Sequence, residues 1–201
     1  MLTTFNSRKK RHFWTILLIA LSLNLTLFKD RVAVSEPVDH SWQARQFSGA
    51  VLNGNNGQYT GEILVNTSAD TAWKVLTDYE NFPRFMPTVI DSQLLTTQGN
   101  QKVFELVYQI RVMVIDKRIR VRIANVETYP QKIAFKLVEG DLRSLQGTWT
   151  IQPISSTQVR IQHQVAVDPG STPSRAVFYN IYESSLKNTL EAIKKEAEGR
   201  N

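Results

Sequence analysis

Residues 173–197 read PSRAVFYNIYESSLKNTLEAIKKEA, and this stretch decides the fold. Apolar side chains recur in it every three or four residues, which is the spacing of one face of an α-helix. They are Phe178, Tyr182, Leu186, Leu190, Ile193 and Ala197. We therefore expect a long amphipathic helix of about six turns at this end of the chain. Thr172 is its expected N-cap, with Pro173 in the first turn.

The region before this helix changes to the two-residue period of β-strands. Residues 118–123 alternate strictly between arginine and an aliphatic residue, which indicates a strand with one face in water. Residues 104–114 alternate in the same way, and 133–138, 145–151 and 159–167 also fit strands. The spacing of these segments predicts an antiparallel meander with short turns.

A hairpin and two short helices are expected further upstream. Residues 43–52 and 59–65 fit two strands, joined by a segment with two Asn-Gly steps that favour a tight turn. Thr67 and Asp70 then have the spacing of a capping box before a short amphipathic helix. Residues 79–87, which contain two prolines, predict a second short helical turn.

The order of these elements favours an α+β fold. An antiparallel sheet with one apolar face must be covered, and only the C-terminal helix is large enough to cover it. A strongly curved sheet around one helix leaves a hollow between them, and such hollows are where proteins hold apolar ligands.

Two motifs resemble signatures of a known family. Residues 75–80 (VLTDYE), followed by Phe-Pro at 82–83 and Phe-Met-Pro at 85–87, resemble the first-helix signature of the polyketide cyclase/dehydrase and coenzyme Q-binding branch of the START-like (SRPBCC) superfamily. Residues 138–149 resemble its second signature, a glycine-containing hairpin that ends in tryptophan. The resemblance covers about residues 58–198.

This resemblance implies a helix-grip (START/Bet v 1-like) fold. In that fold a curved antiparallel sheet wraps around a long C-terminal helix, with two short helices after the first strand. The cavity of the family accepts lipids, quinones, polyketides or similar apolar molecules. Its members include carriers, coenzyme Q-binding proteins and aromatase/cyclases, so the fold alone does not decide an activity.

The N-terminal segment is expected to be a targeting sequence. A basic cluster at 8–11 precedes sixteen residues without charge, 13–28, and this order sends the following chain across a membrane. We expect a signal peptide or a retained N-terminal membrane anchor at 1–35, a linker at 36–44 and the START-like domain at 45–201. The domain would then lie on the non-cytoplasmic side, in a periplasm or lumen.

Charge and composition exclude several classes of function. The first 31 residues hold six Lys or Arg and one Asp, so they carry +5 of the net charge of +6. The rest of the chain is nearly neutral and lacks the basic footprint of a nucleic-acid-binding protein. There is no cysteine, and two of the three histidines fall before residue 45. We therefore predict no metal site of several histidines or thiolates, and no cofactor.

His163 is the main candidate for a functional polar group. It lies on the apolar face of the strand expected at 159–167, so its ring should point inward. There it can hydrogen-bond a ligand carbonyl or act as a general base near neutral pH. The alternative is a neutral core histidine bonded to a neighbouring hydroxyl.

The other candidate ligand-binding residues are aromatic or soft apolar side chains. Two tyrosines offer a polar tip within apolar walls, although ordinary core packing explains them as well. Residues 79–87 supply a flap of aromatic and methionine side chains that suits adaptable apolar recognition, or simply plugs the open end of the sheet. The candidates are Tyr108, Tyr182, Phe82, Phe85, Met86, Phe104, Phe135 and Phe178.

Three arginines, Arg118, Arg120 and Arg122, form a ladder on the outer face of one strand. They can contact lipid phosphates. A row of this kind is more often the solvated side of an amphipathic strand.

Three functions fit this sequence. The preferred one, because inward ionisable residues are few, is binding or carriage of a lipid, quinone, isoprenoid or similar molecule, with movement of 79–87 for access. The second is a cyclase/dehydrase-like enzyme, which needs a second polar group within hydrogen-bond reach of His163. The third is a membrane-held scaffold whose cavity is filled, below about 300 Å³. The oligomeric state is not fixed by the sequence.

Overall fold

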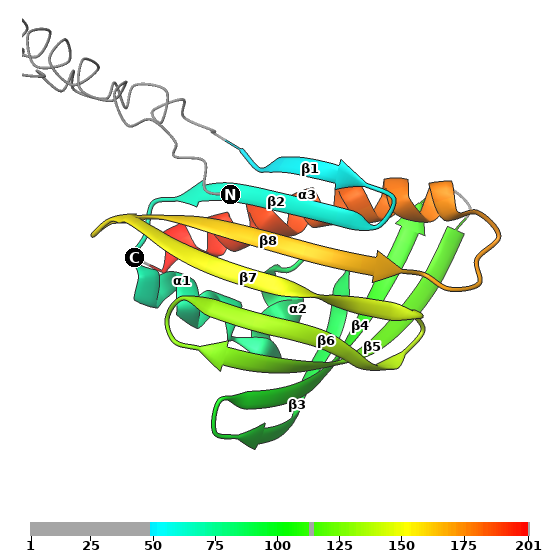
Figure 1. The fold of residues 1–201 in the computed structure, drawn as a ribbon, viewed down its shortest axis with the longest axis horizontal. Helices are drawn as coiled ribbons and strands as arrows, with labels where there is room; N and C mark the ends of the chain where they lie inside the picture. Colours follow the sequence, from blue (N-terminus) through cyan, green and yellow to red (C-terminus); the bar gives the residue numbers. More distant parts are fainter. Residues whose placement is uncertain (1–48, 113–114, 201) are drawn as a thin grey trace, which may run out of the picture. The chain divides into compact units, whose positions relative to one another are not determined.

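The computed structural model describes residues 49–112 and 115–200 (Figure 1). The expected targeting segment, the linker and the start of the first expected strand lie outside the described residues. Within the described ranges, no helix is both long enough and apolar enough to cross a membrane.

The described residues form one antiparallel sheet of eight strands. The strand order is β1-β2-β8-β7-β6-β5-β4-β3, so β1 and β3 are the two edges. This confirms the expected antiparallel sheet. The strands are β1 (Val51–Asn55), β2 (Gln58–Val65), β3 (Val89–Gln98), β4 (Gln101–Val112), β5 (Ile115–Thr128), β6 (Lys132–Gly140), β7 (Ser144–Ser155) and β8 (Gln158–Asp168).

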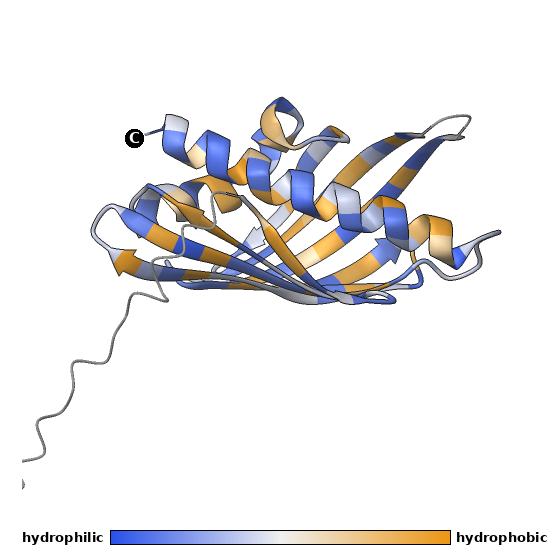
Figure 2. Ribbon diagram, turned by 90° about the horizontal axis from the view of Figure 1, so that it is seen from above, coloured by the Kyte–Doolittle hydropathy of each residue, from blue (hydrophilic) through white to orange (hydrophobic). Residues whose placement is uncertain are grey.

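One face of the sheet is covered by helices. The long helix α3 (Arg175–Gly199) lies over this face, as Figure 2 shows from above. Three short elements, α1 (Ala69–Leu76), the 3₁₀ turn η2 (Tyr79–Asn81) and α2 (Phe82–Phe85), follow β2. The architecture confirms the expected helix-grip fold, with a sheet wrapped around the C-terminal helix.

Both expected helix caps are wrong by one or two residues. At α3, Ser174 has extended backbone angles and its Oγ accepts from the amide of Val177, so Ser174 rather than Thr172 is the N-cap and Pro173 lies before the helix. At α1, the N-cap is Ser68 and not Thr67. Thr67 lies instead in the turn that leaves β2.

The edge strand β3 has no counterpart among the expected strands. Only Val89 in this strand is buried, and two register irregularities interrupt its pairing with β4. An edge strand pairs on one side and packs little of its surface, so its sequence lacks a regular apolar alternation.

Helix α3 is fastened to one side of the sheet by polar contacts. Four of its side chains bond to β2 or to residues next to β1 and β2. Among the described residues, no hydrogen bond joins α3 to β3, β4, β5 or β6. The four contacts are Tyr59 Oη to Glu183 Oε1 (2.9 Å), Ala50 N to Glu191 Oε1 (2.5 Å), Lys194 Nζ to Leu64 O (2.6 Å) and Asn66 N to Glu198 Oε1 (2.9 Å).

Candidate functional site

A cavity of about 620 Å³ lies between α3 and the concave face of the sheet. This volume is within the usual range of roughly 300–1,000 Å³ for ligand sites. The cavity is therefore open, which argues against the filled-cavity scaffold considered from the sequence.

The cavity wall is largely apolar because it is formed by the inward-facing side chains of the strands. Along each strand these alternate with side chains that face outward. Aliphatic side chains come from β4, β5, β7 and α3, and the segment 169–174 completes the rim. The aliphatic wall includes Leu106, Ile119, Val121, Ile123, Leu145 and Leu186.

Eight of the nine candidate residues lie in the lining of this cavity. They come from α2 and its C-cap, three strands (β4, β6 and β8) and α3, which the fold brings together from distant parts of the sequence. Their contact with a ligand stays a prediction. The eight are Phe82, Met86, Phe104, Tyr108, Phe135, His163, Phe178 and Tyr182.

Phe85 is the candidate that the structure places elsewhere. Its ring packs edge-on against Phe82, with ring centres 5.9 Å apart, and the guanidinium of Arg200 lies 5.8 Å from its centre. Phe85 therefore joins α2 to the C-terminal end of α3 instead of lining the cavity.

His163 is buried between two aromatic rings. Its ring stacks on Trp149 at 3.7 Å and on Phe135 at 5.4 Å between centres. Burial lowers the pKa of His163 to about 3, and its Nδ1 has no hydrogen-bond partner in the protein. The histidine is thus neutral at physiological pH and too weakly basic to accept a proton readily there.

The neutral state of His163 predicts a pH dependence of stability. The unfolded histidine binds a proton near its ordinary pKa of 6.5, whereas the folded one does so only near 3. Stability contributed by the neutral ring is present above pH 6.5 and is lost as the pH falls toward 3, by at most about 1.4 kcal/mol per pH unit. We expect His163→Phe to reduce the loss of unfolding free energy between pH 7 and pH 5, measured by urea denaturation. An unchanged pH dependence would contradict this prediction.

Tyr108 and Tyr182 provide two hydroxyl groups in the lining. Burial raises the pKa of Tyr108 to about 12 and also raises that of Tyr182, so both phenols keep their protons. Among the described residues, neither hydroxyl has a hydrogen-bond partner. They are polar groups in an apolar wall, as expected for a site that orients an amphipathic ligand.

One end of the cavity is closed by a network that was not expected from the sequence. Asn125 Nδ2 donates to Tyr79 Oη at 3.0 Å, and Tyr79 Oη donates to Glu127 Oε1 at 2.5 Å. The alternation that begins at Arg118 continues through β5 and puts Asn125 on the inward face. Extending the expected strand beyond residue 123 would have found it.

The opposite end of the cavity is open to solvent. The exposed residues of the lining gather there, next to the turn between β6 and β7 and the start of α3: Lys117, Asp141, Ser171, Pro173 and Val177. Lys117 and Asn125 are eight residues apart on β5, or roughly 25 Å along the strand. These exposed residues offer a second route into the cavity, and the expected movement of the segment 79–87 stays a prediction.

The 3₁₀ turn η2, near the closed end of the cavity, is held to the rest of the domain by several contacts. Arg200 pairs with Asp78 at 2.7 Å, and Ser92 Oγ donates to the carbonyl of Tyr79.

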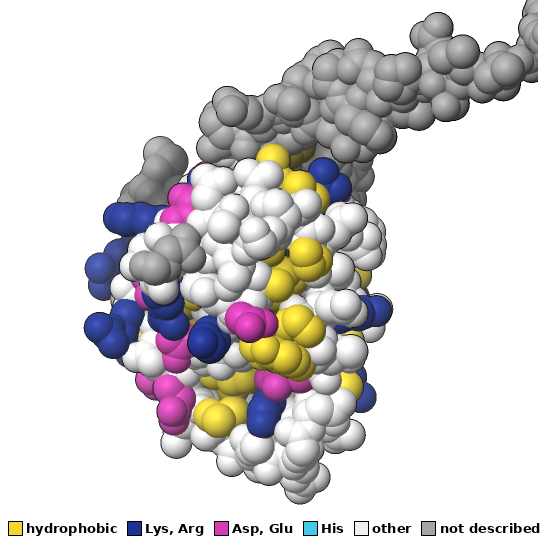
Figure 3. All heavy atoms as spheres, turned by 90° about the vertical axis from the view of Figure 1, so that its left-hand side faces the viewer, with side chains coloured by type: hydrophobic (Ala, Val, Ile, Leu, Met, Phe, Trp, Pro, Cys, Tyr) yellow, Lys and Arg dark blue, Asp and Glu magenta, His cyan; other side chains and the backbone are white. Residues whose placement is uncertain are grey.

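Figure 3 looks onto the side of the domain that carries α1 and the C-terminal end of α3. Apolar, basic and acidic side chains are interspersed on this face.

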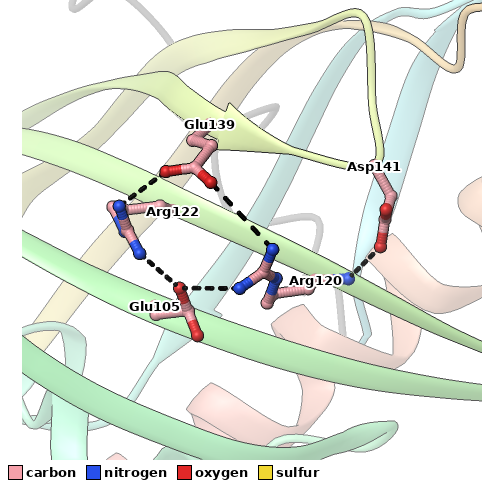
Figure 4. Close-up of polar contacts among 5 residues, drawn as sticks. All are labelled: Glu105, Arg120, Arg122, Glu139 and Asp141. Atoms are coloured by element: carbon pink, nitrogen blue, oxygen red, sulfur yellow. Dashed lines mark hydrogen bonds and ion pairs between the residues drawn. The ribbon is translucent and has the colours of Figure 1, made fainter.

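Two of the ladder arginines are paired on the outer face of the sheet (Figure 4). Arg122 bonds to Glu139 at 2.6 Å and to Glu105 at 3.0 Å. Arg120 lies 4.0 Å from Glu139 and 3.9 Å from Glu105. The backbone amide of Arg120 also donates to Asp141. These pairs favour the solvated strand face over a phosphate site.

The Arg122 network predicts a stability difference between two surface arginines. Arg122 bridges two carboxylates and is only 33% exposed, whereas Arg111 pairs with Asp116 at a site where it is 71% exposed. We expect Arg122→Met to lower the unfolding free energy by about 1 kcal/mol and Arg111→Met to leave it unchanged. Equal effects of the two substitutions in urea denaturation would contradict the prediction.

Fold and cavity together define a helix-grip domain of the START-like class. A sequence model of the family described as "Polyketide cyclase / dehydrase and lipid transport" matches residues 65–194. The chain belongs to this family, which confirms the resemblance seen in the two motifs.

Known proteins resemble this chain in sequence or in structure, at low sequence identity. The ribosome association toxin RatA of Escherichia coli (strain K12) is 24% identical over 136 residues, covering 68% of this chain and 84% of RatA. A STAR-related lipid transfer protein from Xanthomonas axonopodis has a TM-score of 0.60 and 18% identity, covering 74% of this chain and 92% of that one. The Zhui aromatase/cyclase of Streptomyces sp. R1128 has a TM-score of 0.59 and 16% identity, covering 71% and 94%. These proteins have different activities, so the likeness shows the fold alone.

Proposed function

We propose that this domain binds and carries an apolar small molecule in the cavity between the sheet and α3. The observation that carries the proposal is the open, mainly apolar cavity of about 620 Å³. A filled core would be the more stable arrangement if the domain had no ligand, because cavities cost stability in proportion to their volume.

Burial of apolar surface supplies the affinity in this proposal. Each Å² removed from water is worth about 25 cal/mol, so a ligand that buries about 300 Å² gains about 7.5 kcal/mol before the cost of association. The few polar groups of the lining would then fix the ligand's orientation and select its head group.

Catalysis has less support. The cyclase/dehydrase alternative requires a second polar side chain within hydrogen-bond reach of His163. In the described part of the chain no side chain makes such a bond, and the low pKa of His163 opposes a role as general base. We therefore assign binding and not proton transfer to this site.

Native mass spectrometry of the protein purified from its own membranes or envelope tests the proposal. We expect a defined apolar molecule at one per chain. An empty protein that also fails to take up a panel of lipids, isoprenoids and quinones would overturn the proposal. We further propose export of the domain, and the same mass shows whether residues 1–35 are retained. Protease protection in intact cells or organelles then places the domain.

A further inference from the structure

The closed end of the cavity presents an unsatisfied acceptor. Asn125 is 95% buried (5% exposed) and belongs to the cavity lining, yet its Oδ1 has no hydrogen-bond partner in the protein. Buried polar atoms are nearly always paired, since an unpaired one loses about 1–3 kcal/mol. An oxygen of this kind in a ligand cavity needs a partner from outside the chain.

The chemistry of Tyr79 fixes which end of the Asn125 amide is free. Tyr79 has one hydroxyl proton, and Glu127, a carboxylate, can only accept. Burial, together with the bond to Glu127, raises the pKa of Tyr79, so the phenol keeps that proton. Tyr79 Oη therefore gives its proton to Glu127 and can only accept from Asn125. The amide must turn Nδ2 to Tyr79, which leaves Oδ1 as the free group.

We infer that the ligand of this cavity carries a hydroxyl group that donates a hydrogen bond to Oδ1 of Asn125 at the closed end. This inference rests on the proposed function and names the class of ligand: an apolar molecule with an alcohol or phenol head. His163 is a second lining residue with an unpaired nitrogen, and its neutral ring can give or take a bond.

An acceptor-only head group does not fit this end of the cavity. An ether, ester or quinone oxygen would face Oδ1 with lone pairs on both atoms. The amide cannot turn to offer Nδ2, because the turn would break its bond to Tyr79 and put Oδ1 against an oxygen with no proton to give. Sites built to hydrogen-bond a hydroxyl reject analogues that lack it.

Pairs of probes that differ only in the hydroxyl test the inference. A series of medium- and long-chain primary alcohols, with farnesol, is compared with the methyl ether of each by titration calorimetry or displacement of a fluorescent lipid. We expect each alcohol that fits to bind the full chain at least about tenfold more tightly than its ether. The ether has the larger apolar surface, so apolar burial alone predicts the opposite order.

Three variants locate the selectivity. In Asn125→Leu the acceptor is removed at similar size, and the preference for alcohol over ether should fall to about one. In Tyr79→Phe the amide is free to turn, so the ether should gain affinity relative to the alcohol even if the leucine variant folds poorly. Asn188→Leu, the same change at an exposed position of α3, should keep the preference.

The outcomes separate this inference from the proposed function. Equal or tighter binding of the ethers to the wild-type chain overturns the inference and leaves the proposed function standing, because a water molecule can then satisfy Oδ1. A preference that survives in Asn125→Leu also overturns it. Failure of the wild-type chain to bind any probe or any other apolar molecule overturns the proposed function, and the inference falls with it.

Discussion

Replacing Ser185 and Thr189 together with phenylalanine is expected to weaken ligand uptake by at least about tenfold. Both residues lie in the cavity lining on α3, one helical turn apart. Two benzyl groups would occupy space that the ligand needs, and they would replace ligand contacts with contacts inside the protein. Because the new side chains fill an existing cavity, the thermal midpoint should stay the same or rise.

A matched control exists on the same helix. Ser184 and Asn188 are also one turn apart, but both are exposed and neither lines the cavity. The double phenylalanine variant at these positions should bind like the wild-type chain, as measured by native mass spectrometry of the copurified ligand. Equal loss in both variants would mean that the change in α3, and not the filling of the cavity, disturbs binding.

The second large effect is expected where Leu190 of α3 packs over Gly61 of β2. Leu190 is fully buried, and an alanine in its place should cost about 2–5 kcal/mol of unfolding free energy. A Cβ added at Gly61 would lie 2.6 Å from Cδ1 of Leu190, so Gly61→Ala should cost about 1–3 kcal/mol through overpacking.

The double variant Gly61→Ala/Leu190→Ala separates overpacking from other causes. Removing the leucine side chain opens the space that the new methyl group needs. We expect the double variant to be no less stable than Leu190→Ala alone, with a large coupling energy in the urea-denaturation cycle. Additive losses would show that the glycine matters for a reason other than its contact with Leu190.

The sheet and the long helix could be predicted because apolar residues recur in them at a regular spacing, every second residue in the strands and every three or four residues in the helix. Alternation at 118–123 and the stripe from Leu186 to Ala197 each follow from one face that is buried. The edge strand β3 could not be predicted in the same way, because exposure on both faces leaves its sequence without a period. The helix caps were wrong by one or two residues because adjacent hydroxyl residues compete for the same position.

The sequence could predict which side chains of a strand face the cavity, but not the residues that they contact. An inward register can be read along one strand, which is how His163 and Tyr108 were found. The partners of a side chain come from elsewhere in the chain, so the bond between Tyr79 and Glu127, 48 residues apart, has no local signal. The open end of the cavity depends on the packing of the loops before α3 and was likewise out of reach.

Most of the hydrogen bonds that attach helix α3 to the rest of the domain lie on one of its flanks. Four of its polar contacts run along the flank that faces β1 and β2, and Arg175 at its start bonds to Asp168 of β8 at 3.0 Å. Among the described residues, α3 makes no hydrogen bond to β3, β4, β5 or β6. We expect a small rotation about the bonded flank to widen the cavity with the four contacts kept. The mechanical resistance to a wider ligand then comes mainly from apolar packing, which has no preferred direction. The cavity should therefore tolerate variation in the girth of a ligand's tail more readily than variation in its head.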